Sequence, residues 1–479
     1  MHGRRARPAL TMVWIAGALL FAFGLPALFN AGASTASAPP DVTVGVLPGG
    51  GPALVAAGAS GGTDRLIRSL QQGAVVSDNA SSYNNLAAAY MQKARENGDI
   101  TYYNLADEAV RRALDRSPGN FESLTVAAWV RLARHDFRGA ATMTRQSLRD
   151  NSYHSETYGI LGDAELELGD YQGATRDYQR MVDLKPGLAS YNRASHVHWL
   201  YADAPGALSI MRLAITAGAA YAENVAWCQA QLGDDDFFLG SPLAAEQEYK
   251  VALRTFPRDI YALAGLGRLY AGQHRFALAV DYYNRAIAQV PLPQYVIALG
   301  DTYAAMGQLA RARQQYTLAG FIFHLYDVNH VNIGIDRALF DADHDQNLGE
   351  ALRLARSEAT WRHDIRTMDI LAWVLYKNHD YSGALATERQ ALRLGTRDAS
   401  FYYHMGLIDN ALGDGVGARA YLQGALMLNP LFDVRQEPLA IAALRHIESI
   451  RPAHSTTGRQ PSTGSGGGVR VGVGVQPGQ

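Results

Sequence analysis

The segment whose residue types come closest to a metal site runs from Asp341 to Asn347 and reads Asp-Ala-Asp-His-Asp-Gln-Asn. Carboxylate and amide oxygens at alternate positions are typical of a calcium loop. However, Gln346 stands where glycine must turn the chain, and Leu352 stands where a bidentate glutamate completes the coordination. Asp and Asn are also common in turns, because their side chains hydrogen-bond the backbone. We therefore expect a turn between helices here, and no metal.

Other reactive residue types are scattered. His196 and His198 are two positions apart, and residues at that spacing on a helix point in different directions, so they are not expected to chelate a metal together. Cys228 is the single cysteine, which excludes a disulfide within the chain and a thiolate cluster. Neither a phosphate-cradling glycine loop nor a His-Glu-x-x-His motif is present. We expect no enzyme activity and no cofactor.

The charge balance narrows the class of partner. The 479 residues include 43 lysines and arginines and 45 acidic residues, for a net charge of −2. Such a chain has no long-range field that favours nucleic acid, so we expect no nucleic-acid partner. Its length exceeds what one compact core supports, unless the chain is built from repeats that stack along one axis.

Alanines recur at intervals of 33 to 39 residues through most of the chain, which indicates a repeat. They are Ala106, Ala140, Ala174, Ala207, Ala245, Ala279, Ala312, Ala351, Ala384 and Ala418. A small residue stands twelve positions before nearly all of them; Leu339, before Ala351, is the exception. Two antiparallel helices approach closely only where both present small side chains. The spacing therefore predicts stacked helical hairpins, since one hairpin cannot bury its apolar face alone.

The clearest copy runs from Tyr158 through Leu161-Gly162, Tyr171, Ala174 and Tyr178 to Pro186. This order of large residue, Leu-Gly, aromatic, Ala, aromatic and Pro on a 34-residue period resembles the tetratricopeptide repeat. The resemblance implies an all-α fold, a right-handed α-α superhelix of about ten helix-turn-helix units over residues 83–431. It also implies an interaction scaffold rather than a catalyst.

Outside the repeats, the composition suggests further segments. Residues 63–82 and 438–451 are expected to form capping helices, because an end repeat otherwise exposes its core face. Residues 34–62 read as a flexible linker, and residues 452–479 as a disordered tail. Residues 1–33 combine clustered arginines, an apolar run and small residues, which fits either a cleaved signal peptide or a retained membrane anchor. Either way, the rest of the chain is expected outside the cytoplasm: periplasmic, secreted or anchored at the outer face of the cytoplasmic membrane.

The first helix of each unit is expected, by the same resemblance, to line a concave groove. The register places aromatic, acidic and basic residues there: Trp129, Asp163, His196, Trp199, Trp227, Asp234, Arg268, Asp301, Asp336, Trp373 and Tyr376. Exposed aromatic rings among charges are typical of binding hot spots. The rings could instead fill gaps between adjacent first helices. We expect a protein or an extended peptide as the partner; the alternative is a glycan, on which tryptophan faces would stack.

Overall fold

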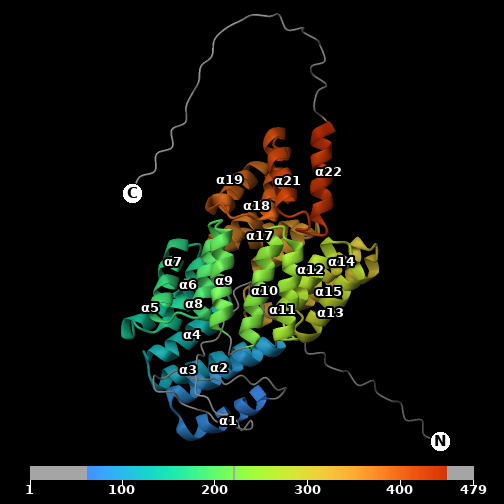
Figure 1. Cartoon of the computed structure of the whole chain (residues 1–479). Helices are drawn as coiled ribbons and strands as arrows, with labels where there is room; N and C mark the ends of the chain where they lie inside the picture. The colour runs from blue at the N-terminus through green and yellow to red at the C-terminus, as the bar shows by residue number, and fades with distance from the viewer. Residues whose placement is uncertain (1–61, 219–221, 450–479) are drawn as a thin grey trace, which may run out of the picture.

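The computed structural model describes residues 62–218 and 222–449, which form twenty-two α-helices, one short 3-10 helix at Leu392–Leu394 and, within these ranges, no strand. The expected all-α superhelix is confirmed: consecutive helices pair into antiparallel hairpins that stack into a coil (Figure 1). The segments expected to be signal or anchor and disordered tail lie outside the described residues, as does nearly all of the linker. Among the described helices, none is both long and apolar enough to cross a bilayer.

Each of the ten hairpins has an inner helix and an outer helix. The inner helices are α2 (Ala80–Asn97), α4 (Phe121–Ala133), α6 (Ser155–Leu168), α8 (Leu188–Leu200), α10 (Ala222–Phe238), α12 (Ile260–Gly272), α14 (Pro293–Ala305), α16 (Gly334–Asp343), α18 (Ile365–Lys377) and α20 (Ala399–Ala411). The outer helices are α3 (Thr101–Arg116), α5 (Phe137–Asp150), α7 (Tyr171–Leu184), α9 (Ala204–Ala217), α11 (Pro242–Thr255), α13 (Phe276–Gln289), α15 (Leu309–Val328), α17 (Leu348–Ala359), α19 (Tyr381–Ala391) and α21 (Gly415–Leu428). Two further helices, α1 (Gly62–Ser77) and α22 (Gln436–Ser449), pack on the two ends.

The repeating alanines are the close-contact points of the hairpins. All ten are at most 2% exposed. On the facing helix, a Cβ added to Gly162 would lie 2.4 Å from the ring of Tyr178, and one added to Gly233 would lie 2.7 Å from Tyr249. Such distances leave no room for a side chain, so the glycine is what lets the next aromatic ring enter the hairpin.

Successive turns of the coil pack against one another. The turn after α4 meets the start of α16, where the His135 ring Nδ1 lies 2.6 Å from the Asn332 carbonyl oxygen. The His363 amide donates to the Leu168 carbonyl at 3.2 Å, and the Thr396 hydroxyl donates to the Leu200 carbonyl. Each pair is separated by about 196 residues, roughly six repeats of 34. The C-terminal helices therefore pack against the ends of α8, α10 and α12, and they lie at the end of the molecule opposite α1–α3 (Figure 1).

The contact between turns contains buried polar interactions in addition to apolar packing. The guanidinium of Arg362, 3% exposed, pairs with Glu167 of the other turn and with Asp364 at 2.9 Å. The Ile365 amide donates to the Tyr171 hydroxyl at 2.7 Å. One hydrophobic cluster joins residues of α2–α6 to residues of α14–α16. The two turns thus share a core.

The stack is interrupted at one place. Every pair of consecutive α-helices packs backbone against backbone except α15 and α16. Here α15 is lengthened to 20 residues and α16 is shortened to 10, and the alanine spacing reaches 39 residues. The contact of His135 with Asn332 places the start of α16 against the turn after α4, so α16 begins the second turn.

Ala279→Leu tests the close-contact register. Ala279 is fully buried, so the larger side chain should overpack the hairpin of α12 and α13 and cost about 1–3 kcal/mol of unfolding free energy. Ala277→Leu is the matched control, because Ala277 is exposed two residues earlier in the same helix. Equilibrium denaturant unfolding measures both; equal stabilities would contradict the register.

Candidate functional site

The tryptophans predicted to line the groove differ in their exposure. Trp129, Trp227 and Trp373 are 9%, 8% and 3% exposed, so most of each ring is packed between neighbouring helices. Trp199 is only half-buried, as is Tyr376. Tyr376 stacks on Trp373 with ring centroids 5.1 Å apart. The inner helices therefore use most of their large rings as packing and leave Trp199 the most accessible.

The predicted acidic residues take part in connections between helices. Asp163 accepts hydrogen bonds from the Tyr178 hydroxyl at 2.9 Å and from Arg193 Nε at 2.7 Å. These three residues come from α6, α7 and α8, so one carboxylate joins a hairpin to the next inner helix. Asp163 and Arg193 are both buried, which makes this a structural ion pair rather than a free ligand.

The same connection recurs further along the coil. Asp234 accepts from the Tyr249 hydroxyl at 2.7 Å and pairs with Arg268. Asp301 accepts from the Tyr316 hydroxyl at 2.8 Å. The connection has a signal in the sequence, since Gly-Asp followed fifteen residues after the aspartate by tyrosine occurs at all three places. The alanine spacing does not reveal it, because that spacing marks only the close contact within each hairpin.

Asp301 and Asp336 also have partners from other units. Asp301 also meets His344 Nε2 at 3.0 Å and Arg435 at 3.1 Å, and Arg435 comes from just before the C-terminal cap. Asp336 pairs with Arg366 at 2.8 Å. The acidic positions of the predicted groove thus hold the coil together.

An inner aromatic surface remains on α8, α10 and α12, formed by Trp199, Phe238 and Arg268; the buried Trp227 and its neighbour Tyr261 lie apart from it. The Trp199 and Phe238 rings lie 6.2 Å apart, and Trp227 meets Tyr261 edge-on at 6.5 Å. The Arg268 guanidinium lies 4.8 Å from the Phe238 centroid. Phe238, Tyr261 and Arg268 are half-buried. Trp199, Phe238 and Arg268 thus form one contiguous patch with a cation at its edge, whereas Trp227 and Tyr261 meet near the other end of α10.

The carboxylates of the segment 341–347, which resembles a calcium loop in sequence, do not point toward one another. Asp343 accepts from the Trp373 indole at 2.8 Å, Asp345 from Lys377 at 2.6 Å, and Asp341 from Asn347 at 3.2 Å. The three side chains therefore face different neighbours, and no cluster of metal-ligating residues occurs in the described parts of the chain.

His196, His198 and Cys228 each have different surroundings and do not form a common site. His198 Nδ1 lies 2.7 Å from Asp203, whereas burial lowers the pKa of His196 to about 3. Cys228 is buried, and burial raises the pKa of its thiol above the range in which a thiolate forms at neutral pH. None of these groups has the surroundings of a nucleophile or a metal ligand.

A buried polar cluster occupies the C-terminal units. His404 Nδ1 lies 2.7 Å from Asp369, and its ring stacks on Trp373 at 4.3 Å. Glu388 is fully buried nearby, and burial together with the charge of Asp369 raises its pKa well above the usual range. Burial opposes the charged form of His404, but Asp369 outweighs it, so the pKa of His404 is also raised.

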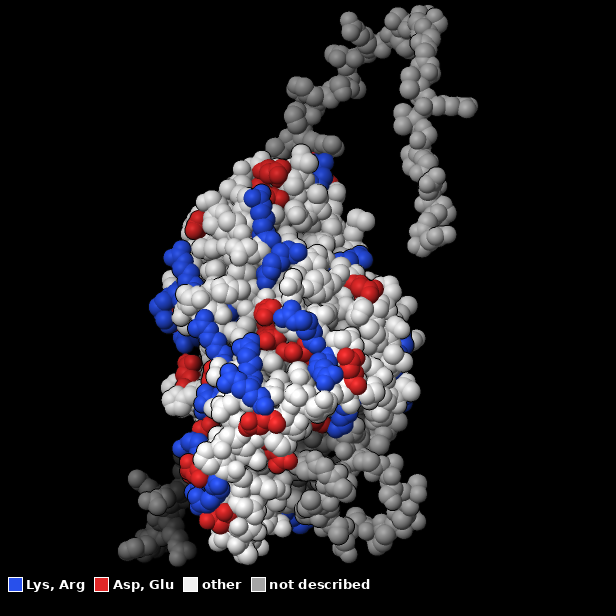
Figure 2. Space-filling view, turned by 90° about the vertical axis from the view of Figure 1, so that its left-hand side faces the viewer, with Lys and Arg blue, Asp and Glu red and all other residues white. Residues whose placement is uncertain are grey.

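The outer face carries mostly solvated or internally engaged charges. Lysine and arginine side chains form a band over the side of the coil shown in Figure 2, which includes α5 and α7. Arg145 pairs with Glu165 at 2.7 Å, and Arg138 and Arg180 lie over Trp361 and Tyr153. These three arginines therefore engage neighbouring residues of the chain.

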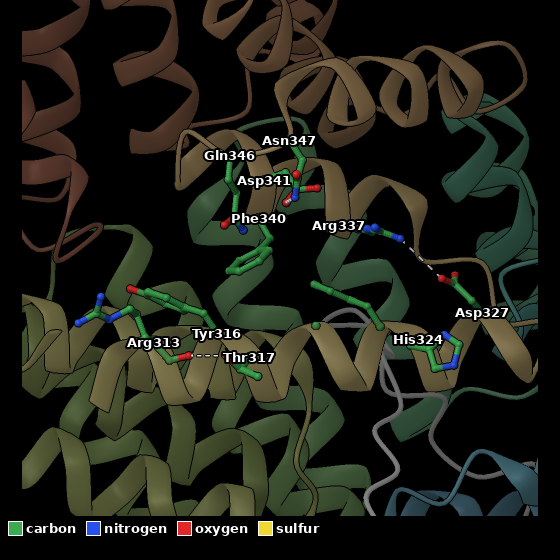
Figure 3. Close-up of a pocket in the computed structure, with 12 residues that line it drawn as sticks. Arg313, Tyr316, Thr317, His324, Asp327, Arg337, Phe340, Asp341, Gln346 and Asn347 are labelled. Carbon is green, nitrogen blue, oxygen red and sulfur yellow. Dashed lines mark hydrogen bonds and ion pairs between the residues drawn. The ribbon is translucent and has the colours of Figure 1, made fainter. Parts of the chain in front are cut away.

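A pocket of about 540 Å³ opens at the break between α15 and α16 (Figure 3). Aromatic rings of both helices form part of its wall: Tyr316 and Phe323 from α15, and Phe340 from α16. The turn residues Gln346 and Asn347 close one side. The 39-residue spacing before Ala351 marks this place in the sequence, although the spacing by itself indicates only a departure from the repeat.

Two stretches of the chain, residues 125–189 and 218–292, match the model of the tetratricopeptide repeat family. The chain carries tetratricopeptide repeats. The remaining hairpins continue the same helix pairing around the coil. No curated protein matches the chain.

Several solved structures are similar to this tetratricopeptide-repeat chain at low scores. PilW, described as a widely conserved type IV pilus biogenesis factor, is 14% identical, with 42% of this chain and 93% of that chain covered and a TM-score of 0.36. Cut9–Hcn1, an APC/C hetero-tetramer, is 13% identical, with 80% of this chain and 93% of that chain covered and a TM-score of 0.31. MamA is 20% identical, with 35% of this chain and 91% of that chain covered and a TM-score of 0.27.

Glu388→Gln tests the buried polar cluster through the pH dependence of stability. A carboxyl with a raised pKa binds its proton more tightly when folded, so its contribution to stability is lost as pH rises from about 4.3, the unfolded value. Relative to the wild type, the variant should gain unfolding free energy between pH 5 and 8, by about 1.4 kcal/mol for each unit of elevation within that window. Glu350→Gln on α17, where the carboxylate pairs with the exposed Arg353, should show no such gain in unfolding free energy over this pH range. If the unfolding free energy of Glu388→Gln varied with pH in the same way as that of the wild type, the raised pKa of Glu388 would be contradicted.

Proposed function

We propose that this protein is an extracytoplasmic scaffold that binds an extended segment of a partner protein along the inner aromatic surface. The tetratricopeptide-repeat fold is a protein-interaction scaffold, and it presents the inner helices of successive hairpins as one surface. The observation that carries the proposal is the continuity of that surface from Trp199 through Phe238 to Arg268. Aromatic and arginine side chains supply most of the binding energy at protein interfaces.

The exposure of the rings favours a peptide over a glycan. A sugar ring stacks on an open aromatic face, but Trp129, Trp227 and Trp373 are each less than a tenth exposed. Trp199 and Phe238 instead form a joined strip, which suits the alternating side chains of an extended peptide. The acids beside them are already paired, as Asp234 is with Arg268. Because these carboxylates already have partners, they are less available to accept hydrogen bonds from sugar hydroxyls.

The extracytoplasmic location rests on the start of the sequence. Arg4, Arg5 and Arg7 precede an apolar run from Ala9 to Phe29, followed by small residues. Clustered arginines stay on the cytoplasmic side of a membrane while the chain beyond the apolar run is exported. The single cysteine, Cys228, is buried, so export to an oxidising compartment would create no disulfide within the chain.

Site-specific photo-crosslinking in the producing cells tests the proposal. A photoreactive phenylalanine at Trp199 should crosslink to a discrete partner protein. The same residue at Leu213, which is 53% exposed on the outer helix α9, should not. A reporter active only outside the cytoplasm, fused after residue 449, should be active in the same cells.

Three results would contradict this account. Equal crosslinking from positions 199 and 213 would remove the inner surface as the site. Binding to a glycan array without any protein crosslink would favour the sugar-binding alternative. An inactive reporter would place the protein in the cytoplasm, whatever its partner.

A further inference from the structure

The pocket at the break between α15 and α16 contains a buried carboxylate with one unused oxygen. Asp341 is 2% exposed. Its Oδ1 accepts one long hydrogen bond, from Asn347 at 3.2 Å; the Gln346 side chain also stabilises the carboxylate, but no donor among the described residues meets Oδ2 in good hydrogen-bonding geometry. Both oxygens of a buried carboxylate normally find donors, because leaving one unpaired carries a desolvation cost.

The neighbouring carboxylates of the same turn, Asp343 and Asp345, differ from Asp341 in their burial. Asp343 accepts from both Trp373 and Gln436, at 2.8 and 3.0 Å. Asp345 pairs with Lys377. Asp343 is only partly buried and Asp345 is exposed, so Asp341 is the one carboxylate of this turn with a buried oxygen that lacks a hydrogen bond.

The charge of Asp341 is compensated only in part by its surroundings. Burial raises the pKa of Asp341, and Asn347, the more distant charge of Arg337 and the nearby Gln346 amide oppose this shift without cancelling it. The Oδ2 atom still lacks a donor in hydrogen-bonding geometry. A further positive charge at Oδ2 would complete the environment of this group.

The walls around Asp341 suit a cation on a long apolar stem. Phe340 lies 5.8 Å from Phe323 and 5.9 Å from Tyr316, ring centroid to ring centroid. Aromatic faces attract ammonium and guanidinium groups, and they also pack against the methylene chain that carries them. The volume of about 540 Å³ accommodates one long side chain with its flanking backbone.

The rim carries charges of the opposite kind. Arg313 and His324 line the pocket from α15 and are exposed. Arg337, on the α16 side, reaches Asp327 only at 3.7 Å, and both side chains are well exposed (Figure 3). An acidic residue close to the inserted cation would therefore find donors at the rim. The charges are arranged with the negative group deep and the positive groups shallow.

We propose that this pocket binds a lysine or arginine side chain of a partner segment, with the cation at Asp341 and a nearby acidic residue of the segment at Arg337, one helical turn before Asp341 on α16. This inference names a second contact for the partner proposed above and rests on that function. It differs from the inner aromatic surface in place and chemistry. The break in the stack is what creates it, since a regularly packed α16 would fill the space.

Selection of random heptapeptides displayed on phage tests the pocket, with the folded full-length protein as bait. Peptides selected by the wild type should be enriched in lysine or arginine with aspartate or glutamate within two residues. Asp341→Asn keeps the shape and the bond from Asn347 but removes the charge, and it should abolish the basic enrichment. Asp345→Asn is the matched control from the same turn and should select the same peptides as the wild type.

A second measurement guards against a folding defect. Because Asp341→Asn removes an incompletely paired buried charge, its thermal midpoint should equal or exceed that of the wild type. A selected peptide should bind the variant at least tenfold more weakly in titration calorimetry. A lower midpoint would mean that Asp341 has a structural role, and acidic-only or unbiased peptides would overturn the assigned chemistry. Photo-crosslinking from Trp199 that persists when these tests fail would leave the proposed function intact.

Discussion

The structure depends on the contact between two successive turns of one coil. Arg362 is the centre of this contact: its guanidinium is almost fully buried, pairs with Glu167 across the turns, and lies 5.0 Å from the Phe137 ring. Burial raises the pKa of Glu167 to about 7 although Arg362 opposes the shift. Charged groups accept such burial only when they are paired and hydrogen-bonded. This arrangement holds two successive turns of the repeat array in contact, which we call closure of the coil; without it the turns could lie apart.

Closure determines what the inner surface can do. Repeats in an open array contact only their neighbours, but here residues about 196 positions apart hydrogen-bond, and the acids of the predicted groove become part of the framework. Asp301 illustrates this, because it receives Tyr316 of its own hairpin and Arg435 from near the end of the coil. The surface left for a ligand is accordingly narrower than the sequence suggested. It consists of the strip around Trp199 and the pocket at the break.

The repeat itself could be predicted from the sequence because its cause is local. A buried alanine such as Ala174 and the glycine twelve residues before it follow from the closeness of two helices, and that requirement recurs in every unit. Closure could not be predicted in the same way. It results from small rotations added over about six units, and the residues that meet, such as Leu200 and Thr396, carry no pattern of their own. The pocket has a weak signal, the long spacing before Ala351, but spacing alone does not reveal the free oxygen of Asp341.

A double-mutant cycle between Glu167 and Arg362 tests the closed coil most directly. The two residues are 195 positions apart and can interact only if the turns touch. The unfolding free energies of Glu167→Gln, Arg362→Met and the double variant should give a coupling energy of about 1–3 kcal/mol, as expected for buried residues in contact. A coupling energy within about 0.5 kcal/mol of zero would mean that the turns lie apart and would contradict the account.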